Sequence, residues 1–152
     1  MVSHKGRVAV DGVTDEKCLT GGVKCFAGGR IRIRRSNIVG GHGSGIACIH
    51  SGKVEVLDTG IKGCNGWGLC VTHDTSCLVM SGGRIEGCKV GGLLCSICAR
   101  AWVKNVEVVG CGGPGVEKTR HGMVLTLGVR VDGRELQVRL EFRHWRHGVR
   151  LH

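Results

Sequence analysis

An apolar residue followed two positions later by glycine recurs along this chain at nearly constant spacing. The copies are Ile38-x-Gly40, Ile61-x-Gly63, Ile85-x-Gly87 and Val108-x-Gly110, and they lie 23, 24 and 23 residues apart. Glycine followed by an aliphatic residue has the same period, at Gly22-Val23, Gly45-Ile46, Gly68-Leu69, Gly92-Leu93 and Gly115-Val116. Repetition with a fixed period of about 20 to 50 residues is typical of solenoids. The chain is therefore predicted to fold as an array of stacked coils.

Each repeat has the chemistry of short strands. Apolar and charged residues alternate in runs such as Ile31-Arg32-Ile33 and Val54-Glu55-Val56. This is the period of a strand, and the several glycines of each repeat argue against a helix. Three short strands per coil, joined at glycine corners, describe an all-β, single-stranded parallel β-helix. At a strand spacing of about 4.8 Å, about five coils would stand about 24 Å tall.

The interior of these coils must be filled by aliphatic residues and cysteine, because the chain has no Tyr and only two Phe. Two inward columns follow the period: Val8, Ile31, Val54, Leu78, Ala101 and Val124, and then Val10, Ile33, Val56, Met80, Val103 and Thr126. Cysteines follow it too, as Cys64, Cys88 and Cys111 and as Cys25, Cys48, Val71 and Cys95, where Val71 interrupts the set. Free cysteine packs as a small apolar residue, so we expect reduced core cysteines and no disulfide framework.

The 152 residues are predicted to form one domain. We expect a degenerate first coil or N-terminal cap in residues 1–21, regular coils in 22–133 and a basic capping strand and tail in 134–152. Asp132-Gly133 is a strong hairpin signal. In the outward column, Val79, Trp102 and Leu125 replace the charged residues of earlier coils. We expect the apolar face of residues 136–142 to cover this patch.

The formal charge of +10 is concentrated near the C-terminus, at Arg134, Arg139, Arg143, Arg146 and Arg150. Such a tail is typical of contact with nucleic acid or another acidic surface, and equally of a solvated edge that discourages aggregation. Its candidate partner-binding residues are Arg139, Arg143, Trp145 and Arg146. Apart from Phe142 of the capping strand, Trp145 is its one aromatic residue, so the tail offers no stacking platform for single strands. Elsewhere the charges are mixed, with predicted outward stacks of Arg84 on Glu107 and of Lys62 on Glu86.

The sequence favours no catalytic, metal or cofactor site. Cleavage of glycosidic bonds uses two carboxyl groups within about 5 to 9.5 Å of each other. The nearest candidates, Asp58 and Asp74, have no carboxylate partner in the predicted coils, and both are expected to be turn residues. Cys95-x-x-Cys98 is a single pair, whereas zinc uses four ligands, and His50 and His73 alone are too few. Catalysis stays open, but a non-catalytic role is preferred.

Two tryptophans are candidate partner-binding residues. Trp67 lies between Gly66 and Gly68 at a predicted corner, where a partly exposed indole would serve a sugar or a protein contact. The alternative for Trp67 is an indole folded over the adjacent glycines. Trp102 belongs to the outward apolar patch described above.

The segment GKVEVLDTGIKGCNGWGL, from Gly52 to Leu69, resembles the right-handed parallel β-helix repeat of the pectate-lyase-like superfamily, in particular its carbohydrate-binding and sugar-hydrolysis repeats. The resemblance covers roughly residues 22–133 and implies the fold. Its members include polysaccharide lyases, hydrolases and epimerases, phage tailspikes, and intracellular binding scaffolds such as substrate-recognition parts of ubiquitin ligases. No catalytic motif of the enzymes maps onto this chain.

The expected function is a non-catalytic scaffold for a protein partner or for self-association. One alternative is a protein that binds or cleaves polysaccharide, and a second is binding of nucleic acid or an acidic surface through the tail. Residues 1–20 have no apolar run of signal-peptide length, and no stretch is long and apolar enough for a membrane span. The expected location is therefore intracellular and cytoplasmic, with no membrane partner.

Overall fold

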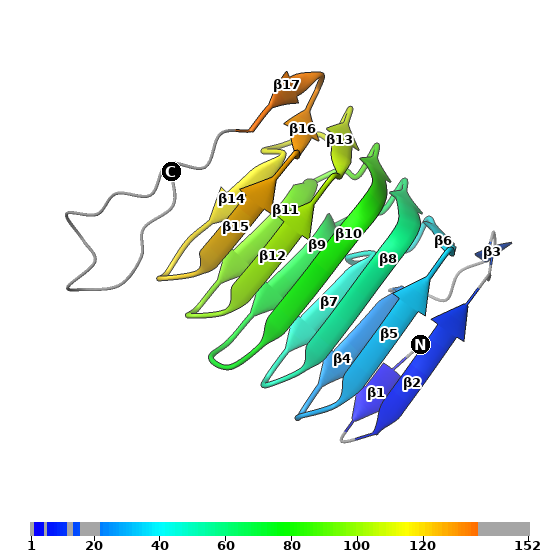
Figure 1. Ribbon diagram of the computed structural model, residues 1–152, viewed down its shortest axis with the longest axis vertical. Helices are drawn as coiled ribbons and strands as arrows, with labels where there is room; N and C mark the ends of the chain where they lie inside the picture. The colour runs from blue at the N-terminus through cyan, green and yellow to red at the C-terminus, as the bar shows by residue number, and fades with distance from the viewer. Residues whose placement is uncertain (1, 5, 12–13, 16–21, 137–152) are drawn as a thin grey trace.

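The computed structural model describes residues 2–4, 6–11, 14–15 and 22–136 of the chain. Within these ranges all regular secondary structure is β-strand, and the strands stack as a solenoid of about five turns (Figure 1). The predicted all-β parallel solenoid is confirmed.

Two stacks of strands run the length of the solenoid. Sheet A contains, in order, β1 (Val2–His4), β4 (Val23–Phe26), β7 (Ile46–Ile49), β9 (Trp67–Thr72), β11 (Gly91–Ser96) and β14 (Val116–Lys118). The long strands of sheet B are β2 (Arg7–Asp11), β5 (Arg30–Arg34), β8 (Lys53–Lys62), β10 (Cys77–Glu86), β12 (Arg100–Lys104) and β15 (Met123–Leu127). Its short strands are β3 (Thr14–Asp15), β6 (Asn37–Val39), β13 (Glu107–Val109), β16 (Arg130–Val131) and β17 (Arg134–Glu135).

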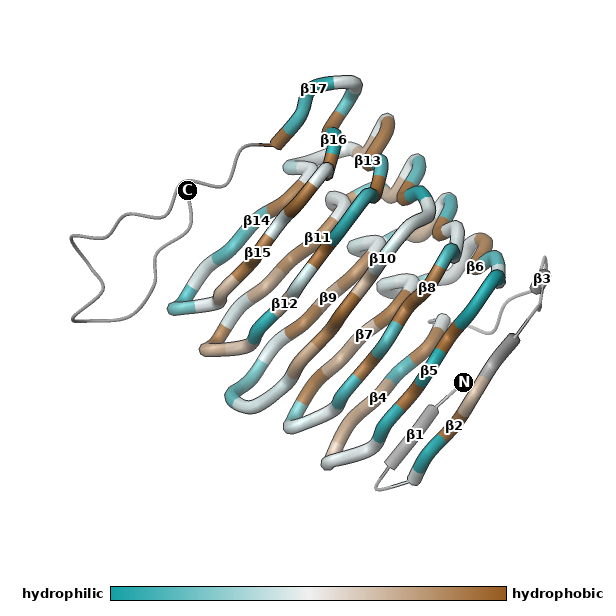
Figure 2. Tube along the Cα trace, in the orientation of Figure 1, coloured by the Kyte–Doolittle hydropathy of each residue, from teal (hydrophilic) through white to brown (hydrophobic). Residues whose placement is uncertain are grey.

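Like residues lie over like in the interior. Ile38, Ile61, Ile85 and Val108 are in parallel register on successive coils and are 4%, 1%, 1% and 2% exposed. Figure 2 shows hydrophilic and hydrophobic residues alternating along β5 and β8. Because alternate side chains of a strand point to opposite faces, this alternation separates the core from the outer side of sheet B.

The apolar-x-Gly pattern and the Gly-aliphatic pattern share one period because the apolar residue of the first lies against the glycine of the second across the interior. A Cβ added to Gly45 would lie 2.6 Å from Ile61 Cγ2, and one added to Gly68 would lie 2.4 Å from Ile85 Cγ2. The same added atom on Gly92 would lie 2.6 Å from Val108 Cγ1. The branched side chains of Ile61, Ile85 and Val108 therefore occupy the space that a side chain would need at Gly45, Gly68 and Gly92, which we call the glycine column.

The turn from sheet A to sheet B is longer in one coil than in the coils on either side of it. Three residues separate Ile49 from Lys53, whereas four, residues 73–76, separate their register partners Thr72 and Cys77. The added residue accounts for the 24-residue spacing in the sequence. Two residues of the longer turn have positive φ, His73 at 73° and Thr75 at 63°.

The described chain ends in the predicted hairpin. β17 pairs antiparallel with β16, and the two residues between them, Asp132 and Gly133, have φ of 48° and 80°. Positive φ at both central positions is typical of a type I′ turn. Leu136 packs against the core. The predicted cover over Val79, Trp102 and Leu125 lies, apart from Leu136, outside the described residues.

Opposite charges stack on parts of the outer surface. Arg84 Nη1 lies 3.9 Å from Glu107 Oε2, as the outward column predicts, and Arg32 Nε lies 3.0 Å from Glu55 Oε2. Glu86 is in register with Lys62, and its carboxylate lies 3.6 Å from Arg84 Nε. These side chains are all well exposed, so each pair contributes about 1 kcal/mol or less.

Candidate functional site

Trp67 is half-buried at the start of β9. Its indole covers Gly91 of the next coil, where an added Cβ would lie 2.3 Å from Trp67 Cζ3. This geometry fits the predicted alternative of an indole folded over glycine, although that glycine belongs to the neighbouring coil. A role for Trp67 in partner binding stays a prediction.

Trp102 lies on the outer side of β12 and is 55% exposed. Its register partners are Val79 on β10, which is 39% exposed, and Leu125 on β15, which packs partly against the core. The structure thus brings the predicted apolar column together on one face. The other candidates, Arg139, Arg143, Trp145 and Arg146, lie outside the described residues.

The two candidate carboxylates are turn residues. Asp58 has φ of 46°, and its side chain lies over Gly82, whose added Cβ would be 2.2 Å from Asp58 Oδ1. Asp74 Oδ1 accepts a hydrogen bond of 2.9 Å from the Thr75 backbone N–H.

His50 and His73 stack with ring centroids 3.9 Å apart. In the described part of the chain, no group of three or more His, Cys, Asp or Glu side chains could hold a metal ion.

Cys95 and Cys98 do not face one another as a ligand pair. Cys95 is fully buried, and its thiol donates to the carbonyls of Ala99 at 3.2 Å and Met123 at 3.3 Å. Cys98 is exposed. All nine cysteines in the described ranges are free thiols.

A second set of cysteines lies inside the corner that follows the apolar-x-Gly pattern. Its members, which we call the thiol ladder, are Cys64, Cys88 and Cys111. Hydrogen bonding by the Cys64 thiol lowers the pKa of the Cys88 thiol to about 6, and Cys111 contributes in the same direction while burial opposes both. A thiolate is the nucleophilic form of cysteine. Cys88 is nevertheless 0% exposed, so no substrate reaches it, and the thiol ladder belongs to the core.

The buried Cys48 should make stability fall at high pH. Burial raises the pKa of its thiol from 9.0 to about 12. Between these values the unfolded chain binds fewer protons than the folded chain, so stability decreases as pH rises, by about 1.4 kcal/mol per pH unit for one such group. We expect a smaller decrease in Cys48→Val, since Val71 fills the equivalent place on the next coil. Urea midpoints at about pH 7.5 and pH 10 measure it, and identical shifts in both proteins would contradict the assignment.

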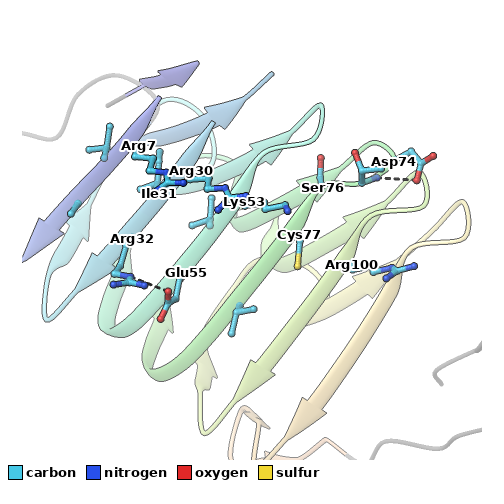
Figure 3. A pocket seen from close by; sticks show the side chains of 15 residues that line it. Arg7, Arg30, Ile31, Arg32, Lys53, Glu55, Asp74, Ser76, Cys77 and Arg100 are labelled. Atoms are coloured by element: carbon cyan, nitrogen blue, oxygen red, sulfur yellow. Dashed lines mark hydrogen bonds and ion pairs between the residues drawn. The ribbon is translucent and has the colours of Figure 1, made fainter. Parts of the chain in front are cut away.

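A groove of about 930 Å³ lies over sheet B. Its floor and walls come from β2, β5, β8, β10 and β12, and the longer turn contributes Asp74, Thr75 and Ser76. Four cations line it from one outward column, which we call the cation column: Arg7, Arg30, Lys53 and Arg100. They are in register across successive strands, with the short side chain of Cys77 between Lys53 and Arg100 (Figure 3).

The cation column carries positive charge that the described protein does not neutralise. Its four side chains are exposed, and none makes an ion pair with another described residue. Of the other charges in the groove, Arg32 and Glu55 pair with one another. The Asp74 carboxylate accepts a hydrogen bond from the Thr75 backbone N–H within its own turn. Like charges on adjacent strands repel one another. The column therefore weakens the free fold slightly and favours an anionic ligand.

This groove was not predicted from the sequence, because the charge excess is most conspicuous in the C-terminal tail, where the arginines are close together. A signal was present: the alternating runs Arg30-Ile31-Arg32-Ile33-Arg34 and Arg100-Ala101-Trp102-Val103-Lys104 place every charged residue on the outer side of its strand. Aligning these runs with Lys53 by the repeat period would have predicted the column.

The described residues include no helix with the length and apolar character of a membrane span. Comparison with protein families matches residues 1–129 to the right-handed β-helix region. No curated protein and no solved structure matches the chain. The family match covers most of the sequence and agrees with the stacked parallel strands, so this chain belongs to the right-handed β-helix family.

Proposed function

We propose that the chain is a non-catalytic scaffold that binds an extended acidic macromolecule along the groove of sheet B. The observation that carries this proposal is the cation column, with four exposed cations in register and no ion-pair partner among the described residues. Rigid solenoids commonly bind partners along such extended faces. The groove runs along the solenoid axis, so its ligand is expected to lie across the rungs.

The positions of the candidate acids support a binding role over a hydrolytic one. Asp58 and Asp74 are the residues that the sequence offered for catalysis, and each has a structural role in its turn. Glu55, the remaining acid of the groove, is paired with Arg32. A general acid and base would instead need two carboxyl groups facing a common space.

Charge reversal at two ends of one strand tests the proposal. Lys53 and Lys62 are exposed residues at the first and last positions of β8, but only Lys53 lines the groove. We expect Lys53→Glu to weaken binding of fluorescein-labelled anionic polymers by about tenfold, because an attraction becomes a repulsion. Lys62→Glu, with the same change in net charge, should bind like the natural sequence.

The measurement is fluorescence anisotropy at low salt with three polymers: poly-glutamate, heparin and a single-stranded oligonucleotide. Far-UV circular dichroism checks that both variants are folded. Equal loss in Lys53→Glu and Lys62→Glu would show that the polymers respond to net charge alone, and no binding to any polymer would also refute the groove as a binding site.

A further inference from the structure

We propose that the acidic ligand of the groove is single-stranded nucleic acid, with phosphates along the cation column and a base stacked on Trp102. This inference rests on the proposed function and narrows it to one chemical class.

The outer side of β12 combines two cations with an aromatic ring. Arg100, Trp102 and Lys104 face outward, while Ala101 and Val103 are buried. The outward residues lie about 6.6 Å apart along the strand, and Trp102 is 55% exposed between the two cations. Proteins that bind single strands combine a basic track for phosphates with aromatic rings for bases. One strand of this protein provides both, and its Arg100 belongs to the cation column.

The face around β12 is strongly basic. The matching outward positions of β5, β8, β10 and β12 carry six cations: Arg30, Arg32, Arg34, Lys53, Arg100 and Lys104. The acid among these positions is Glu55, which is paired with Arg32. A folded protein partner presents charges of both signs, whereas a nucleic acid presents one negative charge per nucleotide in a regular series. The regular column therefore fits a polyphosphate better than a protein surface.

The exposed Trp102 indole favours a single strand over a duplex. Base pairing hides the faces of the bases inside a duplex, so a duplex would contact this surface with phosphates and leave the Trp102 indole without a stacking partner. A single strand presents its bases for stacking. Val79 and Leu125 beside Trp102 are aliphatic, so they offer further apolar contact to a base, which would take the place of the cover predicted from residues 136–142.

The test for stacking compares an unstructured twelve-nucleotide single strand with an abasic phosphodiester of the same length. Trp102→Ala should weaken binding of the single strand by about 5- to 150-fold, the range expected for loss of one stacked base. It should leave binding of the abasic chain nearly unchanged. Trp102→Phe, which keeps an aromatic ring, should restore most of the affinity. Equal effects of Trp102→Ala on both probes, or none on either, would overturn the inference.

The test for phosphate contact is the salt dependence of binding. Each phosphate contact to a single strand contributes about 0.7 to the slope of log affinity against log salt. We expect Arg30→Ala with Lys53→Ala to reduce the slope by about 1.4. The control is the full chain with Arg143→Ala and Arg146→Ala in the tail, which should leave the salt slope unchanged. The reverse result would place the nucleic acid on the tail and overturn the inference.

Poly-glutamate, heparin and the oligonucleotide distinguish the two proposals. Should poly-glutamate or heparin bind more tightly than the oligonucleotide and still depend on Lys53, the groove would keep its proposed function while the ligand class proposed here would be wrong. Preference for the oligonucleotide, together with the Trp102 effect, supports both.

Discussion

Replacement of Ile61 by Asp is expected to prevent folding. Ile61 is 1% exposed, lies in register between Ile38 and Ile85, and faces Gly45 across the interior. A carboxylate there would lie among apolar groups, and burial of an unpaired charge costs more than several kcal/mol. Since a domain of this size is stable by only about 5 to 15 kcal/mol, one such substitution removes most or all of the stability.

The matched control is Lys53→Asp in the same strand. Lys53 is exposed on the outer side of β8, so the same new side chain remains in water and should leave folding intact. Far-UV circular dichroism and urea unfolding compare the two proteins. Equal urea midpoints would contradict the assignment of inward and outward faces. The folded Lys53→Asp protein should also show weakened polymer binding, which separates fold from function at one position.

Gly92→Ala is expected to destabilise the protein by about 3 kcal/mol or more, because a single methyl group overfills the narrowest part of the coil. The added Cβ would lie 2.3 Å from the Gly115 carbonyl oxygen and 2.6 Å from Val108 Cγ1. The carbonyl belongs to the backbone of the next coil, so relief requires adjacent rungs to separate.

Gly60→Ala is the control for that substitution. A Cβ at Gly60 would meet only the side chain of Asn37, with Oδ1 at 2.7 Å, and this flexible amide can turn away. The backbone of Gly60 does not have positive φ. Alanine should therefore be neutral or stabilising by about 0.5 kcal/mol through the reduced entropy of the unfolded chain. Urea unfolding measures both variants, and similar losses would show that the glycine column is not a steric requirement.

The fold was predictable from sequence because every coil repeats the same contacts. Ile38, Ile61 and Ile85 recur together with Gly45 and Gly68 since each branched side chain occupies the space beside a glycine. The hairpin was equally local, because two residues with positive φ, Asp132 and Gly133, are enough to turn the chain.

The candidate site was less predictable because its property belongs to a surface. Arg7, Arg30 and Lys53 are separated along the chain, and each looks like an ordinary outward charge in its own strand. Their shared register makes them a column. Asp74 and Thr75 form a wall of the groove because their turn has one added residue. In the sequence this residue shows only as a spacing of 24 instead of 23 between Ile61 and Ile85. Composition therefore drew attention to the tail, where the arginines are close in sequence.

That added residue also has a consequence for how the chain finds its native alignment. Coils with interchangeable contents could be threaded one rung out of step, with aliphatic residues still meeting aliphatic residues and glycines still meeting glycines. A four-residue corner at 73–76, between three-residue corners at 50–52 and 97–99, marks this coil as different from its neighbours. A displaced chain would have to accommodate the bulge against the wrong neighbours, so the irregular corner gives an otherwise periodic molecule a fixed point of reference.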